Sequence, residues 1–157
     1  MAAVSTLPGG PVRVATVDDC SQLLRLWGLL FGEDVAYEPW RSHAREWFAN
    51  FVGEPSVAHF PVIDIEGQIV ATAVGTLELG VPNPHCPQGR TVRLANVITL
   101  SEHRGYGYGT LLVGDVVEWA QSISADRVDL SATPEGQRIY EKAGFVLTSA
   151  PRMKLVL

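Results

Sequence analysis

The chain has 157 residues, 46% of them apolar and 18% charged, which is typical of one globular domain and excludes a disordered chain. Its net charge of −5 argues against a nucleic-acid partner, because such a partner needs a basic face. No apolar run approaches the roughly 20 residues of a membrane-spanning helix, and the start lacks an export signal, so we expect a cytoplasmic protein with Cys20 and Cys86 as free thiols.

The first predicted elements are a short strand and two amphipathic helices. We expect residues 1–10 to be frayed and a single domain to occupy residues 11–157. Val12–Ala15 is the predicted strand, and Asp18 or Asp19 then supplies a helix N-cap. Apolar residues next recur with helical spacing in two stretches. These two stripes are Leu23, Leu26, Trp27, Leu30 and Phe31, and then Trp40, Ala44, Trp47, Phe48 and Phe51.

Two strands follow, joined by a tight turn. They are predicted at Val57–Ile65 and Gln68–Leu79, and Glu66-Gly67 between them suits a two-residue hairpin. Pro61 has no N–H to donate, so it predicts a bulge or an edge position in the first strand. A Pro-rich loop is expected at Val81–Gly89.

The last third alternates strands and helices. Strands are predicted at Val92–Leu100 and Arg127–Ala132, a short helix at Pro134–Ala143, and one or two closing strands at Phe145–Leu157. Between the first two strands runs a helical stripe of Leu112, Val116, Trp119, Ala120 and Ile123. The hairpin strands should be antiparallel and the strand–helix–strand unit of residues 92–132 parallel. The order therefore predicts an α/β (α+β) fold, a mixed sheet with helices on both faces.

A glycine-rich turn between that strand and that helix is the strongest motif. Its glycines alternate with other residues and leave the backbone open to close approach. Amide groups at the start of a helix lack intrahelical partners, and with the helix dipole they form an anion site that suits a phosphate or pyrophosphate. The turn reads Arg104-Gly105-Tyr106-Gly107-Tyr108-Gly109-Thr110.

Two other phosphate-binding motifs fit this turn poorly. A P-loop needs a Gly-Lys-Ser/Thr sequence, and no Lys lies near. A dinucleotide-binding turn has Gly-x-Gly-x-x-Gly and an acid at the end of the next strand. Here the spacing is Gly-x-Gly-x-Gly, and Asp126 and Asp129 fall at the start of their strand.

Two segments in register resemble the GNAT superfamily of acetyl-CoA-dependent N-acetyltransferases. Asn96–Leu112 is similar to the family's acetyl-CoA-binding strand and Arg/Gln-x-x-Gly-x-Gly turn, and Thr133–Phe145 is similar to Asn-x-x-Ala-x-x-Leu-Tyr-x-Lys-x-Gly-Phe. The resemblance is tight over residues 92–146 and extends before them only in element order. It implies the GNAT fold, with about 6–7 strands and about four helices.

The resemblance also implies how acetyl-CoA binds as donor substrate. The pantetheine arm would lie along the free edge of a splayed strand, and the pyrophosphate would meet the amides of the glycine turn. Thr133 replaces the family's Asn, so its bond to the cofactor is in doubt, and the rings of Tyr106 and Tyr108 could face the cofactor or the core. The implied cofactor-binding residues are Val97, Ile98, Thr99, Arg104, Gly105, Tyr106, Gly107, Tyr108, Gly109, Thr110 and Thr133.

Tyr140 matches the tyrosine that the family often uses as general acid; the alternative is a core tyrosine. A tyrosine hydroxyl, with a pKa of about 10, is protonated at neutral pH and can give its proton to a departing thiolate. The amide of Ile98 could stabilise the oxyanion. The position of the family's usual base holds Asn96, which cannot serve, and Glu78 is the first candidate instead; the alternative is a solvated strand-end carboxylate. Glu102 and His103 are expected on the surface.

The acceptor region should follow the first helix. There, acids beside aromatic rings could hold a cationic amine; the alternative is a solvated acidic loop with core aromatics. The residues concerned are Glu33, Asp34, Tyr37, Glu38 and Trp40. His85 and Cys86 offer too few ligands for zinc, so no metal is expected, and His43 and His59 should make ordinary hydrogen bonds.

These observations predict an N-acetyltransferase that moves an acetyl group directly from acetyl-CoA to a small-molecule or peptide primary amine. Two alternatives stay open: a non-catalytic module that binds or senses acyl-CoA, and a transferase of another acyl group. Neither nucleic acid nor membrane is an expected partner. A homodimer, common in the family, is compatible with the sequence.

Overall fold

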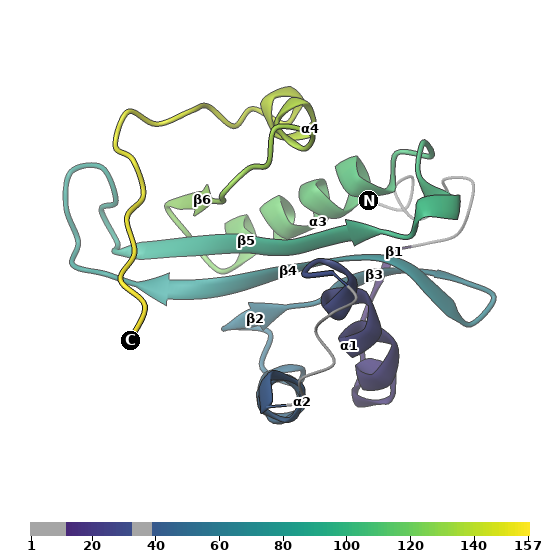
Figure 1. Cartoon of the computed structure of the whole chain (residues 1–157). Coiled ribbons are helices and arrows are strands. Elements are labelled where there is room, and N and C mark those ends of the chain that lie inside the picture. The colour runs from purple at the N-terminus through teal and green to yellow at the C-terminus, as the bar shows by residue number, and fades with distance from the viewer. Residues whose placement is uncertain (1–11, 33–38) are drawn as a thin grey trace.

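A computed structural model describes residues 12–32 and 39–157 (Figure 1). The expectation for residues 1–10 lies outside this part of the chain. The strands are β1 (Val12–Val14), β2 (Ala58–His59), β3 (Pro61–Ile65), β4 (Gln68–Leu79), β5 (Arg90–Thr99) and β6 (Arg127–Asp129). The helices are α1 (Cys20–Leu29), α2 (Pro39–Phe51), α3 (Tyr108–Ser122) and α4 (Gln137–Lys142), with 3₁₀ turns η2 (Val17–Asp19) and η3 (Ser101–His103).

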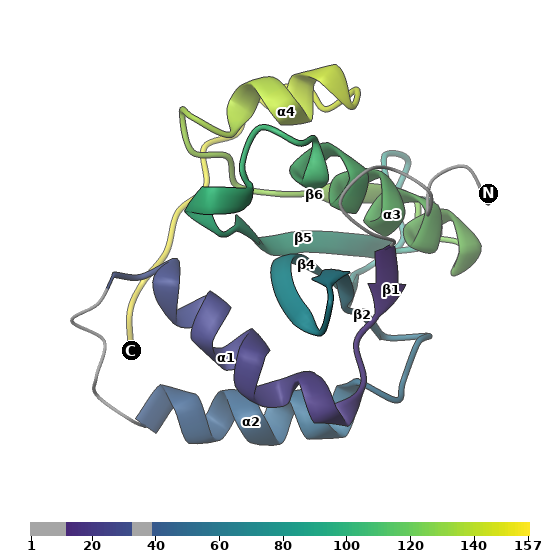
Figure 2. The same ribbon diagram turned by 90° about the vertical axis from the view of Figure 1, so that its right-hand side faces the viewer.

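The strands form one mixed, six-stranded sheet in the order β1-β3-β4-β5-β6, with β2 also paired to β4. All pairs are antiparallel except β5 with β6, which is parallel as the strand–helix–strand unit predicts. Helices α1 and α2 lie against one face, and α3 and α4 lie on the other (Figure 2). The predicted mixed sheet flanked by four helices is confirmed.

The β3–β4 hairpin forms where the turn chemistry predicts it. Glu66 and Gly67 both have positive φ, 51° and 88°, the conformation that a two-residue hairpin turn requires. The carboxylate of Asp64 accepts a hydrogen bond of 2.8 Å from the amide of Gly67, which closes the turn. Ile65 then pairs with Gln68, and the register shifts once, between Ile63 and Asp64, before the pairing continues into the core.

Each face of the sheet has its own hydrophobic core. On the α1–α2 side, Trp27, Phe48 and Phe60 are buried and pack edge to face or tilted. On the other side, α3 packs closely on β4, because a side chain at Gly75 would meet the ring of Trp119 at 3.0 Å. Since both faces are covered, the central strand β4 is almost continuously apolar.

An ion pair fixes the start of α1 to the sheet. The guanidinium of Arg13 on β1 donates to both carboxylate oxygens of Asp19 at 2.8 and 2.9 Å, and also to Asp64 at 2.9 Å. Of Asp18 and Asp19, the two expected N-cap residues, Asp19 is the N-cap of α1, but its side chain makes no capping hydrogen bond in that helix. It accepts instead from the amide of Thr16 at 2.8 Å, in a capping box around η2. The guanidinium holds the pKa of the Asp19 carboxyl below its usual value.

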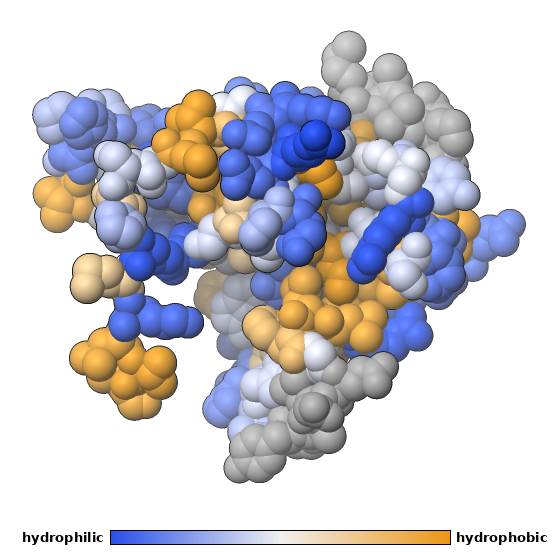
Figure 3. Space-filling view, turned by 45° about the horizontal axis from the view of Figure 1, so that its top comes forward, coloured by the Kyte–Doolittle hydropathy of each residue, from blue (hydrophilic) through white to orange (hydrophobic). Residues whose placement is uncertain are grey.

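Two expectations for the strands are wrong. Pro61 was expected at a bulge or an edge, but it begins β3, which is flanked by β1 and β4; the first position of a strand tolerates the missing N–H. Residues 145–157 were expected to close the sheet, yet they form no strand. Many of these residues favour a strand, but a strand also needs a neighbouring strand to pair with. Among the described residues this segment pairs with none, and its side chains stay largely exposed. Figure 3 shows an apolar cluster projecting from the body, and the exposed residues of this segment include Val146, Leu147, Met153, Leu155, Val156 and Leu157.

Candidate active site

A bulge interrupts β5 near its carboxyl end. Thr72 of β4 pairs with Ile98, and Val74 pairs with Ala95, so two steps along β4 correspond to three along β5. Asn96 lies in this bulge with a φ of 52°, a left-handed conformation that asparagine tolerates better than most residues. The extra residue bends β5 immediately before its last residues.

Beyond the bulge β5 has one unpaired edge. Its parallel pairing with β6 covers only Thr91–Arg93 opposite Arg127–Asp129. The predicted strand Arg127–Ala132 therefore ends early, and within the described residues no strand lies beside Val97–Thr99 on that edge. These residues are half-buried. The edge can bind an extended molecule through backbone hydrogen bonds, as an added strand would.

The glycine turn lies directly after this edge and begins α3. Gly105 and Gly107 have positive φ, 86° and 81°, and Gly107 is the N-cap of the helix. Among the described residues, nothing accepts a hydrogen bond from the amides of Gly105, Tyr106, Gly107, Gly109 and Thr110. Arg104 donates from Nε to the carbonyl of Thr99 at 3.2 Å, which ties the turn to the end of β5. Amides gathered at a helix N-terminus form an anion site.

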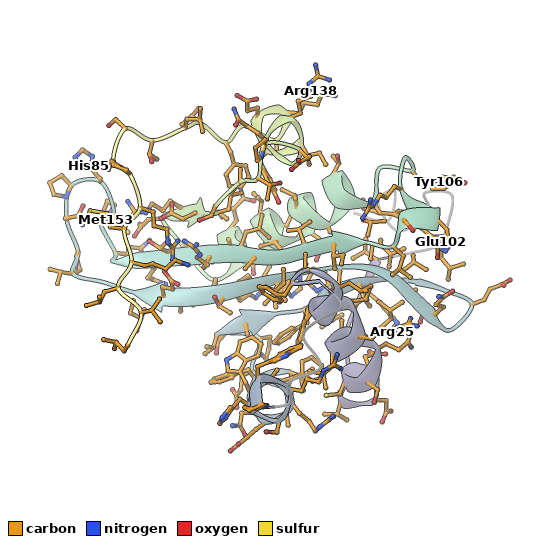
Figure 4. All side chains as sticks on the ribbon, in the orientation of Figure 1. Arg25, His85, Glu102, Tyr106, Arg138 and Met153 are labelled. Carbon is orange, nitrogen blue, oxygen red and sulfur yellow. The ribbon has the colours of Figure 1, made fainter. Side chains whose placement is uncertain are left out.

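The two tyrosines of the turn lie in different environments. Tyr108 is 3% exposed and belongs to the core beneath α3, whereas Tyr106 is 63% exposed. Their rings stack with centroids 5.9 Å apart. Figure 4 shows Tyr106 at the same end of the molecule as Glu102, which is exposed on η3 as expected. Tyr108 therefore anchors the turn to the core, and Tyr106 borders the open side.

Helix α4 carries Tyr140 beside a cavity of about 570 Å³ next to β6. The cavity is lined by Arg93, by residues 127–132 and by the C-terminal segment. The ring of Tyr140 packs edge to face on Phe145, with centroids 6.0 Å apart, and burial raises its pKa above the ordinary value. Its hydroxyl therefore keeps its proton at neutral pH, which suits a proton donor.

Thr133 sits at the turn before α4. Its hydroxyl accepts a hydrogen bond from the amide of Gly136 at 3.2 Å. A side chain at Gly136 would lie 3.2 Å from the ring of Tyr140, so the glycine permits this packing. Thr133 thus orders the turn that positions the tyrosine.

Glu78 lies away from the bulge. It is exposed near the end of β4 and pairs with Thr91 of β5. Since a strand rises about 3.3 Å per residue, Thr91 lies about 23 Å along β5 from Ile98. Its role as the base stays a prediction, and its position allows it to act only through water.

A second cavity, of about 440 Å³, lies on the other face of the sheet, between the helices α1 and α2 and the bulge. Its walls come from four elements and from the segment after α1. The lining residues are Trp27, Phe31, Trp40, His43, Ala44, Trp47, Val74, Thr76, Ala95 and Asn96. Of the predicted acceptor residues, Trp40 lies here, whereas Glu33, Asp34, Tyr37 and Glu38 lie outside the described residues.

The sequence of the chain matches the model of the acetyltransferase (GNAT) family over residues 22–145. The chain belongs to the acetyltransferase (GNAT) family. Its fold and its acyltransferase class follow from this membership, and the match includes the glycine turn, β5 and Tyr140. No curated protein sequence matches the chain.

Solved structures of other GNAT proteins share the fold. A predicted acetyltransferase from Clostridium acetobutylicum, solved with acetyl-CoA, superposes with a TM-score of 0.82 at 22% identity, covering 92% of this chain and 94% of that one. Glucosamine-6-phosphate N-acetyltransferase from Arabidopsis thaliana gives 0.76 at 21% identity over 92% and 96%. An aminoglycoside N-acetyltransferase solved in complex with CoA gives 0.76 at 15% identity over 96% and 98%.

Sequence reasoning missed two features of this GNAT site. The bulge at Asn96 was not predicted, and the only signal for it was the tolerance of asparagine for positive φ. Trp27, Phe31 and Trp47 were assigned to helical core stripes, although they also line the second cavity. No local pattern could separate these roles, because the cavity wall is assembled from distant elements.

Two of the remaining histidine and cysteine side chains make hydrogen bonds between distant segments of the chain. His59 Nε2 lies 2.6 Å from a carboxylate oxygen of Asp115, which joins β2 to α3. Figure 4 shows His85 at the opposite end of the molecule from the glycine turn. Cys86 donates from Sγ to Asp126 at 3.2 Å, and Cys86 and Cys20 are both free. Within the described residues there is no group of three metal-ligating side chains, and no helix is both long and apolar enough to cross a membrane.

Proposed function

We propose that this GNAT protein transfers the acetyl group of acetyl-CoA to a primary amine, by direct attack of the amine on the thioester. The observation that carries the proposal is the unpaired edge of β5 at Val97–Thr99, followed immediately by the open amides of the glycine turn. An extended pantetheine arm fits the first, and a pyrophosphate fits the second. Neighbours solved with acetyl-CoA and with CoA support the choice of donor.

We assign the cofactor contacts along this path. The backbone of Val97, Ile98 and Thr99 faces the pantetheine arm, and the turn from Gly105 to Thr110 surrounds the pyrophosphate. Arg104 is the cation of the motif. Its hydrogen bond to the carbonyl of Thr99 fixes the position of the turn relative to the edge of β5. Thr133 contributes indirectly, by ordering the turn before α4, because its hydroxyl accepts a hydrogen bond from the amide of Gly136.

The chemistry forms one bond and breaks one. The amine nitrogen bonds to the thioester carbonyl carbon, the carbonyl oxygen gains negative charge beside an amide of the unpaired edge of β5, and the C–S bond then breaks. Ile98 was expected to supply that amide, but Ile98 pairs with Thr72 and Leu100 donates to Val70, so the amide of Ile98 points toward β4 and the donor is a neighbouring residue. The thiolate takes a proton from Tyr140, whose hydroxyl is protonated because burial raises its pKa. The proton that leaves the amine passes to water, and Glu78 can accept it only at the end of a water path.

Isothermal titration with CoA and a thiol-release assay with acetyl-CoA over an amine panel test this proposal. We expect micromolar CoA binding and thiol release with at least one primary amine. Tight CoA binding without thiol release from any amine would indicate the acyl-CoA-sensing alternative. Faster release from succinyl-CoA or propionyl-CoA than from acetyl-CoA would assign another acyl group. Absence of CoA binding would overturn the proposal as a whole.

A further inference from the structure

The cavity between α1, α2 and the bulge has four large aromatic side chains in its wall. Indole rings come from Trp27 on α1 and from Trp40 and Trp47 on α2, and Phe31 adds a fourth aromatic side chain. Among the described lining residues none is a carboxylate, lysine or arginine. Such a wall favours a flat, apolar body over a highly charged one.

The cavity reaches the proposed reaction centre. Its floor includes Ala95 and Asn96, and Asn96 is the bulge residue directly before Val97 and Ile98. The cavity is lined by residues of α1 and α2, whereas Tyr140 belongs to α4, and Figure 2 shows α4 on the opposite face of the sheet from α1 and α2. An amine in the cavity can therefore approach the thioester from the side opposite the proton donor.

We propose that the acceptor is an arylalkylamine: a primary amine on a short chain attached to an aromatic ring. This inference rests on the proposed acetyl transfer and specifies its acceptor. The ring would pack among the indoles, and the amine would lie near Asn96. A polyamine, an aminoglycoside or a phosphorylated sugar would bring several charges into a cavity whose described walls offer them no opposite charge.

Steady-state thiol release with acetyl-CoA compares tyramine with spermidine, kanamycin and glucosamine 6-phosphate. We expect kcat/KM for tyramine to exceed that for each of the other amines by at least about 100-fold. A higher value for any of them would overturn the acceptor class and leave acetyl transfer standing. If CoA binds but no amine releases thiol, the proposed acetyl transfer is wrong. The acceptor class is then decided by the binding measurement on the CoA complex alone.

Binding is measured on the CoA complex by quenching of tryptophan fluorescence, with a matched pair of variants. Ala44 lines the cavity, whereas Ala49 is exposed on the same helix, so Ala44→Leu fills the cavity and Ala49→Leu does not. We expect Ala44→Leu to weaken tyramine binding about tenfold while CoA affinity stays unchanged, and Ala49→Leu to change neither. Equal tyramine affinity in both variants, or no tyramine binding to the wild type, would overturn the proposal.

Discussion

The two sides of β5 at its bulge are built from different chemical groups. On the α3–α4 side, the site consists largely of backbone: the unpaired edge of Val97–Thr99 and the amides of the glycine turn. On the α1–α2 side it consists of side chains, chiefly the rings of Trp27, Trp40 and Trp47. Backbone amides offer the same donors whatever the flanking side chains, whereas a wall of rings can change its chemistry with single substitutions.

This difference suggests a division of roles between the two sides. A backbone site suits the donor common to a family, because its geometry depends on glycine and on strand pairing. A side-chain site suits an acceptor that differs between members, such as the glucosamine 6-phosphate and aminoglycoside named for two structural neighbours. Substitutions on one side should therefore change donor handling or acceptor handling, but not both.

The largest expected effect is that of Tyr140→Phe on the α3–α4 side. Removing the hydroxyl should lower kcat about 100-fold and leave CoA affinity unchanged. Because burial raises the pKa of Tyr140, any decline in kcat caused by loss of its proton should begin at a higher pH than for an ordinary tyrosine. The pH profile of kcat, recorded for the wild type and for Tyr140→Phe, tests this expectation. The control is Arg138→Ala, an exposed side chain on the same helix (Figure 4), and an unchanged kcat in Tyr140→Phe would remove the tyrosine from the mechanism.

Asp19→Asn acts on the other side, because Asp19 and Arg13 hold the start of α1, the helix that carries Trp27. Loss of this charged pair should lower the free energy of unfolding by about 2 kcal/mol at pH 7. CoA affinity of the folded protein should not change. Asp18→Asn, at an exposed neighbour, is the control.

The effect of Asp19→Asn should also depend on pH. Since Arg13 holds the pKa of Asp19 below its ordinary value, the stabilisation is present above a pH of about 4 and is lost as the pH falls through the lowered pKa. Thermal unfolding at pH 7 and near pH 3 should show the gap between wild type and variant narrowing in acid. A gap that does not narrow would mean that the carboxylate charge is not the source of the stabilisation.

Gly107→Ala separates the two sides at the glycine turn. With φ at 81°, an alanine there should cost about 1–2 kcal/mol, and the amides should lose their alignment. We expect CoA to bind about tenfold more weakly, measured by isothermal titration. Gly114→Ala, at an exposed position in α3 with open space around it, should leave CoA affinity unchanged; equal losses in both would assign the effect to the helix and not to the turn.

The smallest expected effect is that of Glu78→Gln. Because Glu78 is exposed and far along the strand from Ile98, we expect kcat/KM to fall less than about threefold, measured beside Glu66→Gln in the hairpin turn. A fall in kcat/KM of tenfold or more in Glu78→Gln alone would make Glu78 the base. It would also require that β4 and β5 bring Glu78 closer to the reacting amine during turnover.

Much of the fold was predictable because it is encoded in neighbouring residues. The hairpin at Glu66-Gly67 and the four helices follow from turn chemistry and helical periodicity. The glycine turn follows from a motif of seven consecutive residues, Arg104–Thr110. Even the parallel pairing of β5 with β6 follows from a local rule of chain handedness.

The sequence by itself thus determined the element order, the family and the glycine turn at the start of α3, since each is specified by residues close together in the chain. The tertiary structure decided the bulge at Asn96, the early end of β6, the unpaired segment of residues 145–157 and the aromatic cavity. Those features depend on which distant segments meet: a strand exists only beside a partner, and a cavity wall only where α1, α2, β4 and β5 converge.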